Sequence, residues 1–322
     1  MLKRFLAMFE PFILTLVGTV VLASLLPPRG AGVPIFGAIA DAAIVLLFFL
    51  HGAKLSREAI LAGARNWRLH LAVFAATFIL FPLLGIGIAA LPFLAPPVAM
   101  GLLFLTLLPS TVQSSIAFTA IARGNVAAAV CSASFSNLIG IALTPALAAL
   151  LIHANGSAGI SFASVESIVV QLLLPFIVGH LLRPLIGGFV GRQKKLVTLV
   201  DRGSILLVVY TAFGAAVVGG IWHRLSGAEL AMILAVCIVL LALALLATWG
   251  MGKLLGFSRE DAIVLLFCGS KKSLASGVPM AGVLFAPAQV GIVILPLMLF
   301  HQIQLIACAV IARHYAEEPI KR

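Results

Sequence analysis

Long apolar segments separated by short polar ones recur from one end of this 322-residue chain to the other. Each apolar segment is about 20 residues long, the length that a helix needs to cross the hydrocarbon core of a bilayer. Ten such spans are predicted, at residues 11–27, 34–52, 69–91, 97–122, 125–151, 164–189, 200–221, 228–252, 260–285 and 288–314. The pattern therefore predicts an all-α polytopic membrane protein with ten transmembrane helices.

The composition supports a chain that lies in the lipid bilayer. Hydrophobic residues make up 62% of it and charged residues only 10%, whereas a typical soluble domain has roughly 25% charged residues. No polar segment is long enough to fold separately, so we interpret residues 1–322 as a single transmembrane domain. The four cysteines (Cys131, Cys237, Cys268 and Cys308) fall in apolar runs without paired spacing and are interpreted as small hydrophobic residues.

The positive charges predict the orientation of the chain. The net charge of +11 comes from short loops between spans, which is typical of membrane topology and gives no reason to expect a nucleic-acid partner. With the N-terminus in the cytoplasm, 17 Lys and Arg residues fall inside, and two, Arg29 and Arg224, fall outside. We therefore expect a multi-pass protein of the bacterial inner membrane with both termini cytoplasmic. The remaining two, Lys271 and Lys272, fall within the ninth span.

The two halves of the chain resemble each other at an offset near 160 residues. The run after Asp41 matches the run after Asp201, and residues 105–111 match residues 265–271. This predicts one repeat over about 1–155 and a second over about 160–322. The first span is interpreted as retained, rather than as a signal peptide, because the repeat requires it. Five spans in each half make the repeats inverted in the bilayer, which is the known basis of alternating access.

The fourth and ninth spans each carry a helix breaker followed by polar residues at mid-span. Pro109 precedes a polar run in the fourth span, and Gly269 precedes one in the ninth. Interrupted backbone in hydrocarbon is tolerated where it is buried in protein or lines a cavity, and breaks at equivalent positions point to a transporter binding site. We expect these discontinuous helices to cross. The alternative is two simple kinks whose serines bond back to their own helices.

The lysine pair is expected near the middle of the membrane. Glu260 and Lys271 are separated by roughly 16 Å of helix rise, and a charge at that depth costs at least a few kcal/mol unless it has a partner. One interpretation is a structural brace, with a lysine paired to Asp41 or to helix carbonyls. The other is functional: a lysine holds the negative end of a half-helix or attracts an anionic substrate. Because a lysine removed from water loses its proton more readily, it could also carry a coupling proton.

Further polar residues lie in the fifth and tenth spans, at positions that correspond in the repeat and are expected near the crossing. His301 is open to a second interpretation, a simple hydrogen bond between helices. The candidate substrate and coupling site comprises Thr111, Gln113, Ser114, Ser115, Asn137, Ser270, Lys271, Lys272, Ser273, His301 and Gln302.

Several motifs resemble the bile acid:sodium symporter family, and in particular its bacterial sodium-bile-acid-symporter-like branch. They are Ala122–Val126 (ARGNV), Leu143–Pro145 (LTP), Gly269–Ala275 (GSKKSLA) and His301-Gln302. The similarity runs the length of the chain, although only ARGNV and GSKKSLA are fairly specific. The resemblance implies ten spans, with spans 3–5 and 8–10 forming a core and spans 1, 2, 6 and 7 forming a panel. It places the substrate crevice between the two.

The resemblance also implies sodium ligands that this chain largely lacks. The family's acidic position in the ninth span corresponds to Phe267, and its glutamine corresponds to Lys271. Two hydroxyl ligands of the fifth span correspond to Ala129 and Ala133, and a serine–asparagine pair corresponds to Ser115-Ile116. We therefore expect no metal and no cofactor, with a lysine ammonium in place of the cation. A displaced sodium site at Ser115, Ser132 and Ser136 is the alternative.

These observations predict a secondary transporter of a small organic anion, operating as a uniporter or coupled to protons. One rival is sodium-coupled symport with displaced ligands drawn from Gln113, Ser132, Ser136 and Asn137. Another is a regulatory membrane protein that binds a ligand without net transport. An enzyme is disfavoured because neither an HExxH motif nor a Gly-x-Ser-x-Gly motif occurs. Substrate identity, stoichiometry and oligomeric state do not follow from the sequence.

Overall fold

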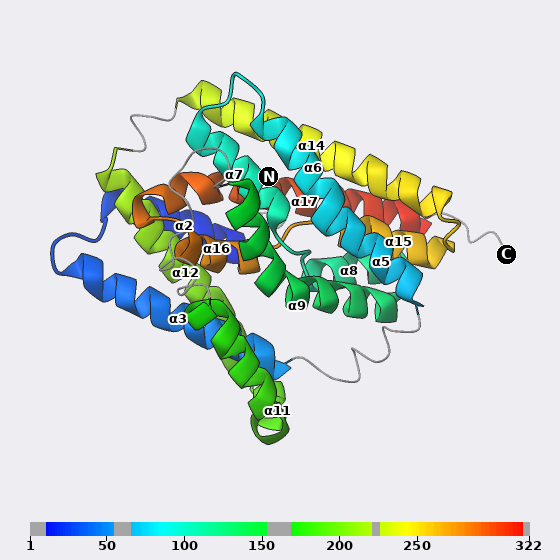
Figure 1. Cartoon of the computed structure of the whole chain (residues 1–322), viewed down its shortest axis with the longest axis horizontal. Coiled ribbons are helices and arrows are strands. Elements are labelled where there is room, and N and C mark those ends of the chain that lie inside the picture. Colours follow the sequence, from blue (N-terminus) through cyan, green and yellow to red (C-terminus); the bar gives the residue numbers. More distant parts are fainter. Residues whose placement is uncertain (1–10, 55–65, 153–168, 221–225, 318–322) are drawn as a thin grey trace. The chain divides into compact units, whose positions relative to one another are not determined.

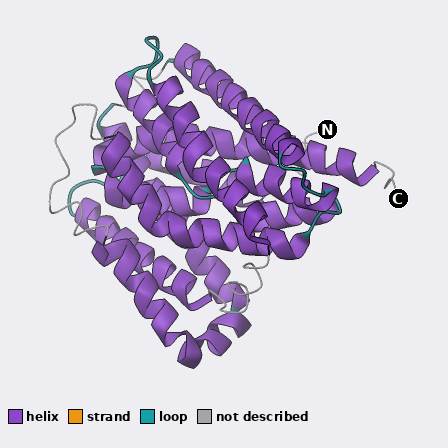
Figure 2. Cartoon of the chain, turned by 45° about the vertical axis from the view of Figure 1, so that its right-hand side comes forward, coloured by secondary structure: helices purple, strands orange, loops and turns teal. Residues whose placement is uncertain are grey.

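The computed structural model describes residues 11–54, 66–152, 169–220 and 226–317, and within these ranges every regular element is helical (Figures 1 and 2). The elements are α2 (Pro11–Leu25), α3 (Gly32–Lys54), α5 (Trp67–Ala75), the π-helical turn η2 (Ala76–Leu80), α6 (Phe81–Ala89), α7 (Pro96–Leu107), α8 (Gln113–Ile121), α9 (Val126–Leu151), the π-helical turn η4 (Val169–Leu173), α11 (Leu174–Arg192), α12 (Lys194–Val218), α14 (Gly227–Leu254), α15 (Arg259–Gly269), α16 (Leu274–Leu284) and α17 (Pro287–Glu317).

Seven helices within these residues are long and apolar enough to cross a membrane. They are α3, α5 continued through η2 and α6, α9, η4 continued through α11, α12, α14 and α17. The three other predicted spans correspond to the shorter α2 and to two pairs of short helices, α7 with α8 and α15 with α16. The chain is therefore a polytopic membrane protein, and its described residues form only helices and their connections.

The helices group into two compact units. The first contains the described residues of Met1–Leu55, Ala158–Gly227 and Val278–Ile294, and the second contains those of Ser56–Ser157, Ala228–Gly277 and Leu295–Arg322. The first unit therefore holds α2, α3, α11 and α12, which are the spans that the resemblance assigned to a panel. The second holds the helices assigned to a core. The segment Val278–Ile294 departs from that division.

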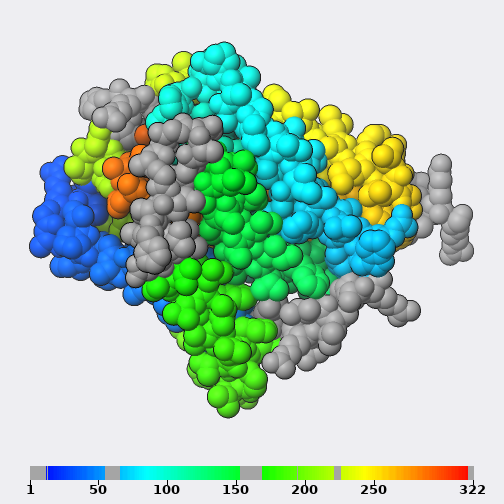
Figure 3. Space-filling model, in the orientation of Figure 1, coloured from blue at the N-terminus to red at the C-terminus, as the bar shows by residue number. Residues whose placement is uncertain are grey.

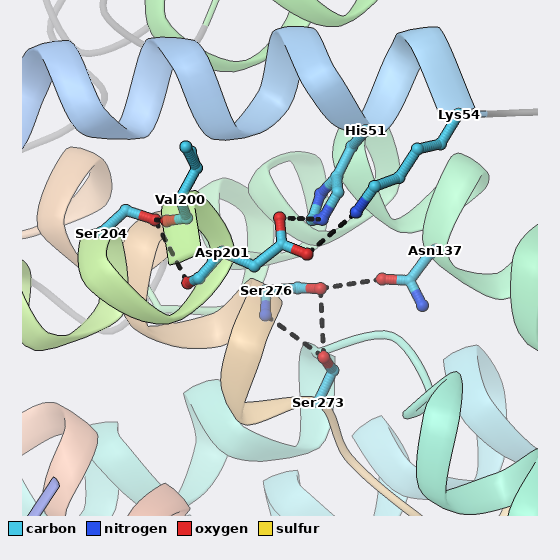
Figure 4. Close-up of polar contacts among 8 residues, drawn as sticks. All are labelled: His51, Lys54, Asn137, Val200, Asp201, Ser204, Ser273 and Ser276. Carbon is cyan, nitrogen blue, oxygen red and sulfur yellow. Dashed lines mark hydrogen bonds and ion pairs between the residues drawn. The ribbon is translucent and has the colours of Figure 1, made fainter. Parts of the chain in front are cut away.

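In the first unit, α3 and α11 pack with their backbones in close contact. A Cβ atom on Gly52 would overlap the carbonyl oxygen of Phe176, and one on Gly179 would overlap that of Phe49. Helix α12 packs against α2 and α3, and Asp201 links it to the end of α3. Its carboxylate lies 2.9 Å from Lys54 Nζ and 3.5 Å from His51 Nε2, and Figure 4 shows both side chains pointing toward it.

In the second unit, one carboxylate gathers the N-termini of three helices. Asp261, in the first turn of α15, accepts hydrogen bonds from Asn66 Nδ2 and Asn125 Nδ2, each at 2.9 Å. Asn66 and Asn125 are the residues that precede α5 and α9. Negative charge at helix N-termini is favourable because it is attracted to the positive end of the helix dipole. Figure 3 shows α5 and α6, in cyan, beside the green α9.

Seven of the Lys and Arg residues on which the predicted orientation rests lie outside the described part of the chain. These are Lys3, Arg4, Arg57, Arg65, Arg224, Lys321 and Arg322. The beginning of the predicted span 164–189 lies outside it as well. The orientation in the bilayer therefore stays a prediction.

The close packing of α3 and α11 can be tested with two substitutions in one helix. Gly52→Ala forces the two backbones apart, so we expect it to lower stability by about 1–3 kcal/mol. Gly37→Ala is the matched control, because nothing lies within 4 Å of its added methyl group and alanine favours helix. Thermal unfolding of the purified protein in detergent measures both. Equal melting temperatures for the two variants would contradict the observed packing.

Candidate functional site

Two helices of the second unit are interrupted where the sequence predicted breaks. Helix α7 ends at Leu107 and α8 begins at Gln113, while α15 ends at Gly269 and α16 begins at Leu274. The interruptions meet, because the backbone N–H of Ser273 donates to the carbonyl of Pro109 at 2.9 Å. The predicted alternative, two independent kinks with serines bonded to their own helices, does not describe this arrangement, although Ser270 Oγ does donate to Leu266 O at 2.5 Å.

Four consecutive carbonyl groups at the end of α7 receive donors from other helices. In a continuous helix these groups would accept N–H donors four residues further along the chain. Here the donors are Thr144 Oγ1 to Leu107 O (2.8 Å), Lys272 Nζ to Leu108 O (2.7 Å), Ser273 N to Pro109 O (2.9 Å) and Asn137 Nδ2 to Ser110 O (2.9 Å). These four carbonyl groups therefore all have partners within the protein, as backbone in hydrocarbon requires.

A glutamine from α17 holds the second interruption. The backbone N–H of Lys272 donates to Gln304 Oε1, and Gln304 Nε2 donates to Lys272 O, each at 2.9 Å. The carbonyl of Phe267, near the end of α15, accepts from Ser115 Oγ of α8 at 3.0 Å. One primary amide thus replaces both backbone partners that Lys272 would have in a regular helix.

The start of α16 is capped by the serine that ends the interruption. Ser276 N donates to Ser273 Oγ at 3.2 Å, the contact made by a helix N-cap. Ser276 Oγ in turn donates to Asn137 Oδ1 at 2.8 Å (Figure 4). Asn137 therefore joins the two breaks, since its amide nitrogen already binds Ser110 O.

Lys272 is completely buried and its ammonium group is bound by neutral oxygens. Its Nζ lies 2.8 Å from Thr77 O, 2.7 Å from Leu108 O and 4.2 Å from the centre of the Phe81 ring. The Thr77 carbonyl is free because η2 is wound as a π-helix, in which Phe81 N bonds to Ala76 O. In that register the donor to Thr77 would be residue 82, a proline without an N–H group.

Lys271 is equally buried but points to a different helix. Its Nζ lies 3.2 Å from Ser114 Oγ and 4.6 Å from the centre of the Phe118 ring, both in α8. Both lysines lie in the non-helical segment between α15 and α16, so helix geometry does not hold their side chains on one face. Within the described residues of the second unit, neither ammonium group contacts a carboxylate, so of the pairings that the sequence left open, helix carbonyls are the observed one for Lys272.

The Lys271 ammonium lies beside the N-terminal end of α8, where the helix dipole is positive. Three hydroxyl groups gather there: Thr111 Oγ1 lies 2.9 Å from Ser114 Oγ and 3.0 Å from Ser115 Oγ. A cation and a positive helix end repel each other, whereas an anion between them would be stabilised by both. The local chemistry therefore favours a negatively charged ligand.

The remaining predicted site residues differ in their placement. His301 Nδ1 lies 2.9 Å from Gln304 Nε2, and Ser136 Oγ accepts from Ser110 N at 2.9 Å, so both belong to the crossing. Ser132 Oγ instead lies 2.8 Å from His70 Nδ1 on α5. Among the described residues, no hydrogen bond joins the side chains of Gln113 or Gln302 to this network.

The contributors that were absent from the predicted site include Thr77, Thr144 and Gln304. Thr77 contributes only a backbone carbonyl, which no side-chain pattern could reveal. Thr144 belongs to the LTP motif, which was noted as part of the family resemblance, but no role at the site was assigned to Thr144 from the sequence. Gln304 is one helical turn beyond His301, and this spacing, which places both on one face of α17, was the available signal.

Apolar packing fills three positions at which the resemblance implied sodium ligands. Ala129 and Ala133 are buried in a cluster with Leu265 and Cys268. Phe267 is buried in a second cluster with residues of α15 and α17. No oxygen-bearing side chain is available at these three positions.

Crossed, interrupted helices with buried ammonium groups inside a polytopic helical protein define a membrane transporter. A sequence profile of the SBF-like CPA transporter family matches residues 10–317. The chain therefore belongs to this family of bile acid symporter-like transporters, and it is not an enzyme. Its substrate is a small molecule that crosses the lipid bilayer.

Relatives match over nearly their whole lengths. An uncharacterized protein of Pseudomonas aeruginosa is 56% identical over 95% of this chain and 93% of its own. The "Putative symporter YfeH" of Escherichia coli K12 is 53% identical over 96% of this chain and 93% of its own. Sodium/bile acid cotransporter 7 of Danio rerio is 27% identical, with 94% and 92% covered.

The two lysines should differ in their effect on stability. Lys272→Met leaves the buried carbonyls of Thr77 and Leu108 without their donor, at a cost on the order of 1–3 kcal/mol for each. Lys271→Met strands no carbonyl, so we expect a much smaller loss. Melting temperatures in detergent measure the difference, and a Lys272→Met protein as stable as Lys271→Met would contradict the assigned contacts.

Proposed function

We propose that the protein is a secondary active transporter of a small organic anion, working by alternating access and without sodium coupling. The observation that carries the proposal is the buried Lys271 ammonium group beside the N-terminus of α8. The proposal has three parts, concerning topology, substrate charge and coupling.

The topology consists of ten crossings in two inverted repeats. Seven long helices, the shorter α2 and the two interrupted pairs account for ten segments. The interruptions fall at residues 108–112 and 270–273, close to the 160-residue offset between the halves. Inverted repeats that contribute one broken helix each suit alternating access, because the two orientations of one fold can exchange. The loop charges favour cytoplasmic termini in a bacterial inner membrane.

The substrate carries a negative charge. Lys272 already donates to two carbonyls, whereas Lys271 has one hydroxyl partner at 3.2 Å and two aromatic rings nearby. An ammonium group has three donor hydrogens, so Lys271 retains capacity for a carboxylate or sulfonate. The first turn of α8 adds unsatisfied N–H groups on the same side.

Sodium coupling is replaced by fixed positive charge. Apolar residues stand at three of the family's ligand positions, and three of the four residues proposed as displaced ligands, all except Gln113, already have partners for their oxygens. Ser132 contacts His70, Ser136 contacts Ser110 N, and the Asn137 oxygen accepts from Ser276. Hard cations need several oxygen ligands at once, which these engaged groups do not supply. Coupling to protons remains compatible with this site.

Removing the Lys271 charge tests the proposed anion site. Uptake of labelled carboxylates and sulfonates, taurocholate among them, is measured in proteoliposomes for the parent and for Lys271→Ala. Losing one partner of a buried charge pair costs at least about 2 kcal/mol, which is roughly a 30-fold loss of substrate affinity. Lys253→Ala is the matched control, since Lys253 is exposed at the end of α14. Full uptake by Lys271→Ala would remove the lysine from the mechanism.

A change of cation gradient tests the coupling. We expect the parent's uptake to be the same when an inward sodium gradient is replaced by one of potassium or choline. Stimulation by sodium would instead favour the rival symport with displaced ligands. Substrate binding without counterflow, unchanged in Lys271→Ala, would favour a regulatory membrane protein.

A further inference from the structure

Gln304 can be oriented in only one way. It is completely buried, and the N–H of Lys272 can only donate, so the amide atom facing it must be the oxygen Oε1 (2.9 Å). The amide nitrogen Nε2 then faces the carbonyl of Lys272, also at 2.9 Å. Exchanging the two amide atoms would set donor against donor and acceptor against acceptor on the same residue.

This orientation determines the protonation of His301. The NH₂ group of Gln304 has two hydrogens; one goes to Lys272 O and the other points to His301 Nδ1 at 2.9 Å. Nδ1 must therefore accept, so the imidazole is neutral and carries its proton on Nε2. A protonated His301 would present a second donor to Gln304, and the contact would become repulsive.

Proton uptake at His301 is therefore incompatible with the intact Gln304–Lys272 contact. Either the imidazole must turn away or Gln304 must release the backbone of Lys272, which lies in the interruption between α15 and α16. The backbone of Lys272 lies within hydrogen-bonding reach of the imidazole, so a protonated ring would compete with Gln304 for it; among the described residues, the charged side chain that acts on His301 is Lys271, from that same interruption. Its positive charge opposes a second one on the imidazole.

We propose that His301 is a proton-binding site linked to the interruption of the ninth span, with proton binding and the closed Gln304–Lys272 contact mutually exclusive. A proton arriving at His301 loosens the backbone that positions both lysines. The meaning of this linkage for transport rests on the proposed function, but the linkage itself is tested without any substrate. Failure of one therefore does not imply failure of the other.

The first measurement reads the tautomer directly. Full-length protein with ¹⁵N-labelled histidine is reconstituted in nanodiscs at about pH 8, above the usual titration range of histidine. His301→Asn, which keeps an acceptor atom but does not titrate, identifies the signal by its loss. We expect the Nε2–H tautomer. An Nδ1–H tautomer, or a protonated ring at this pH, would overturn the proposal.

The second measurement reads the linkage. Because the native contact excludes a proton that the unfolded chain accepts, acidification from about pH 8 to about pH 5.5 should lower the parent's melting temperature. His301→Asn should show a smaller fall. Gln304→Glu places an acceptor opposite Nδ1 and keeps one for Lys272 N, so protonation of His301 should then stabilise the protein. A pH response of the melting temperature in His301→Asn equal to the parent's would overturn the linkage. The tautomer measurement is made on the parent protein, so its result holds whether or not Gln304→Glu folds.

Discussion

Everything at the crossing depends on one constraint: backbone groups released by a broken helix must find partners where water is absent. The two interruptions solve this for each other and through neighbouring helices. The carbonyls at the end of α7 accept from α9, from Lys272 and from Ser273, while the backbone of Lys272 is held by Gln304 of α17. Removing any one donor exposes an acceptor in another element, so the crossing is held as a unit rather than as two separate kinks. Because the hydrogen bonds of the two interruptions depend on one another, they would break and re-form together. This suits a structure that has two discrete states.

Two adjacent lysines serve different needs within this crossing. Lys272 supplies a cation to two carbonyl oxygens and so stabilises the negative end of the α7 dipole. Lys271 places its charge at the positive end of α8, where a bound anion would relieve the repulsion. The apolar packing of Ala129, Ala133 and Phe267 leaves little oxygen for a sodium ion. In the proposed function, the fixed charges take over the part that the resemblance assigns to bound cations in sodium-coupled members of the family, and the proposed proton site at His301 acts on the same backbone.

Much of this could be predicted from the sequence, and the limits have physical reasons. Pro109 and the polar run from Gly269 to Ser273 predicted both interruptions. A helix breaker followed by hydroxyl side chains in the middle of a span is typical of an interrupted transmembrane helix. The partners of the lysines were not predictable. Thr77 O is free only because of a π-turn and Pro82, and helix rotation decides that Gln304 rather than Gln302 faces Lys272. The pairing of Asp201 with His51 and Lys54 at the end of α3 was likewise not indicated by the sequence. Such pairings depend on how helices rotate and pack, which periodicity does not encode.

The central claim is that Lys271 and the first turn of α8 bind the negative charge of the substrate. An experimental structure of the protein with a transported anion bound tests it most directly. The account predicts carboxylate or sulfonate oxygens within hydrogen-bonding distance of Lys271 Nζ and the N-terminal N–H groups of α8, while Lys272 stays on the carbonyls of Thr77 and Leu108. An anion bound away from Lys271, with a sodium ion coordinated at the crossing, would contradict it.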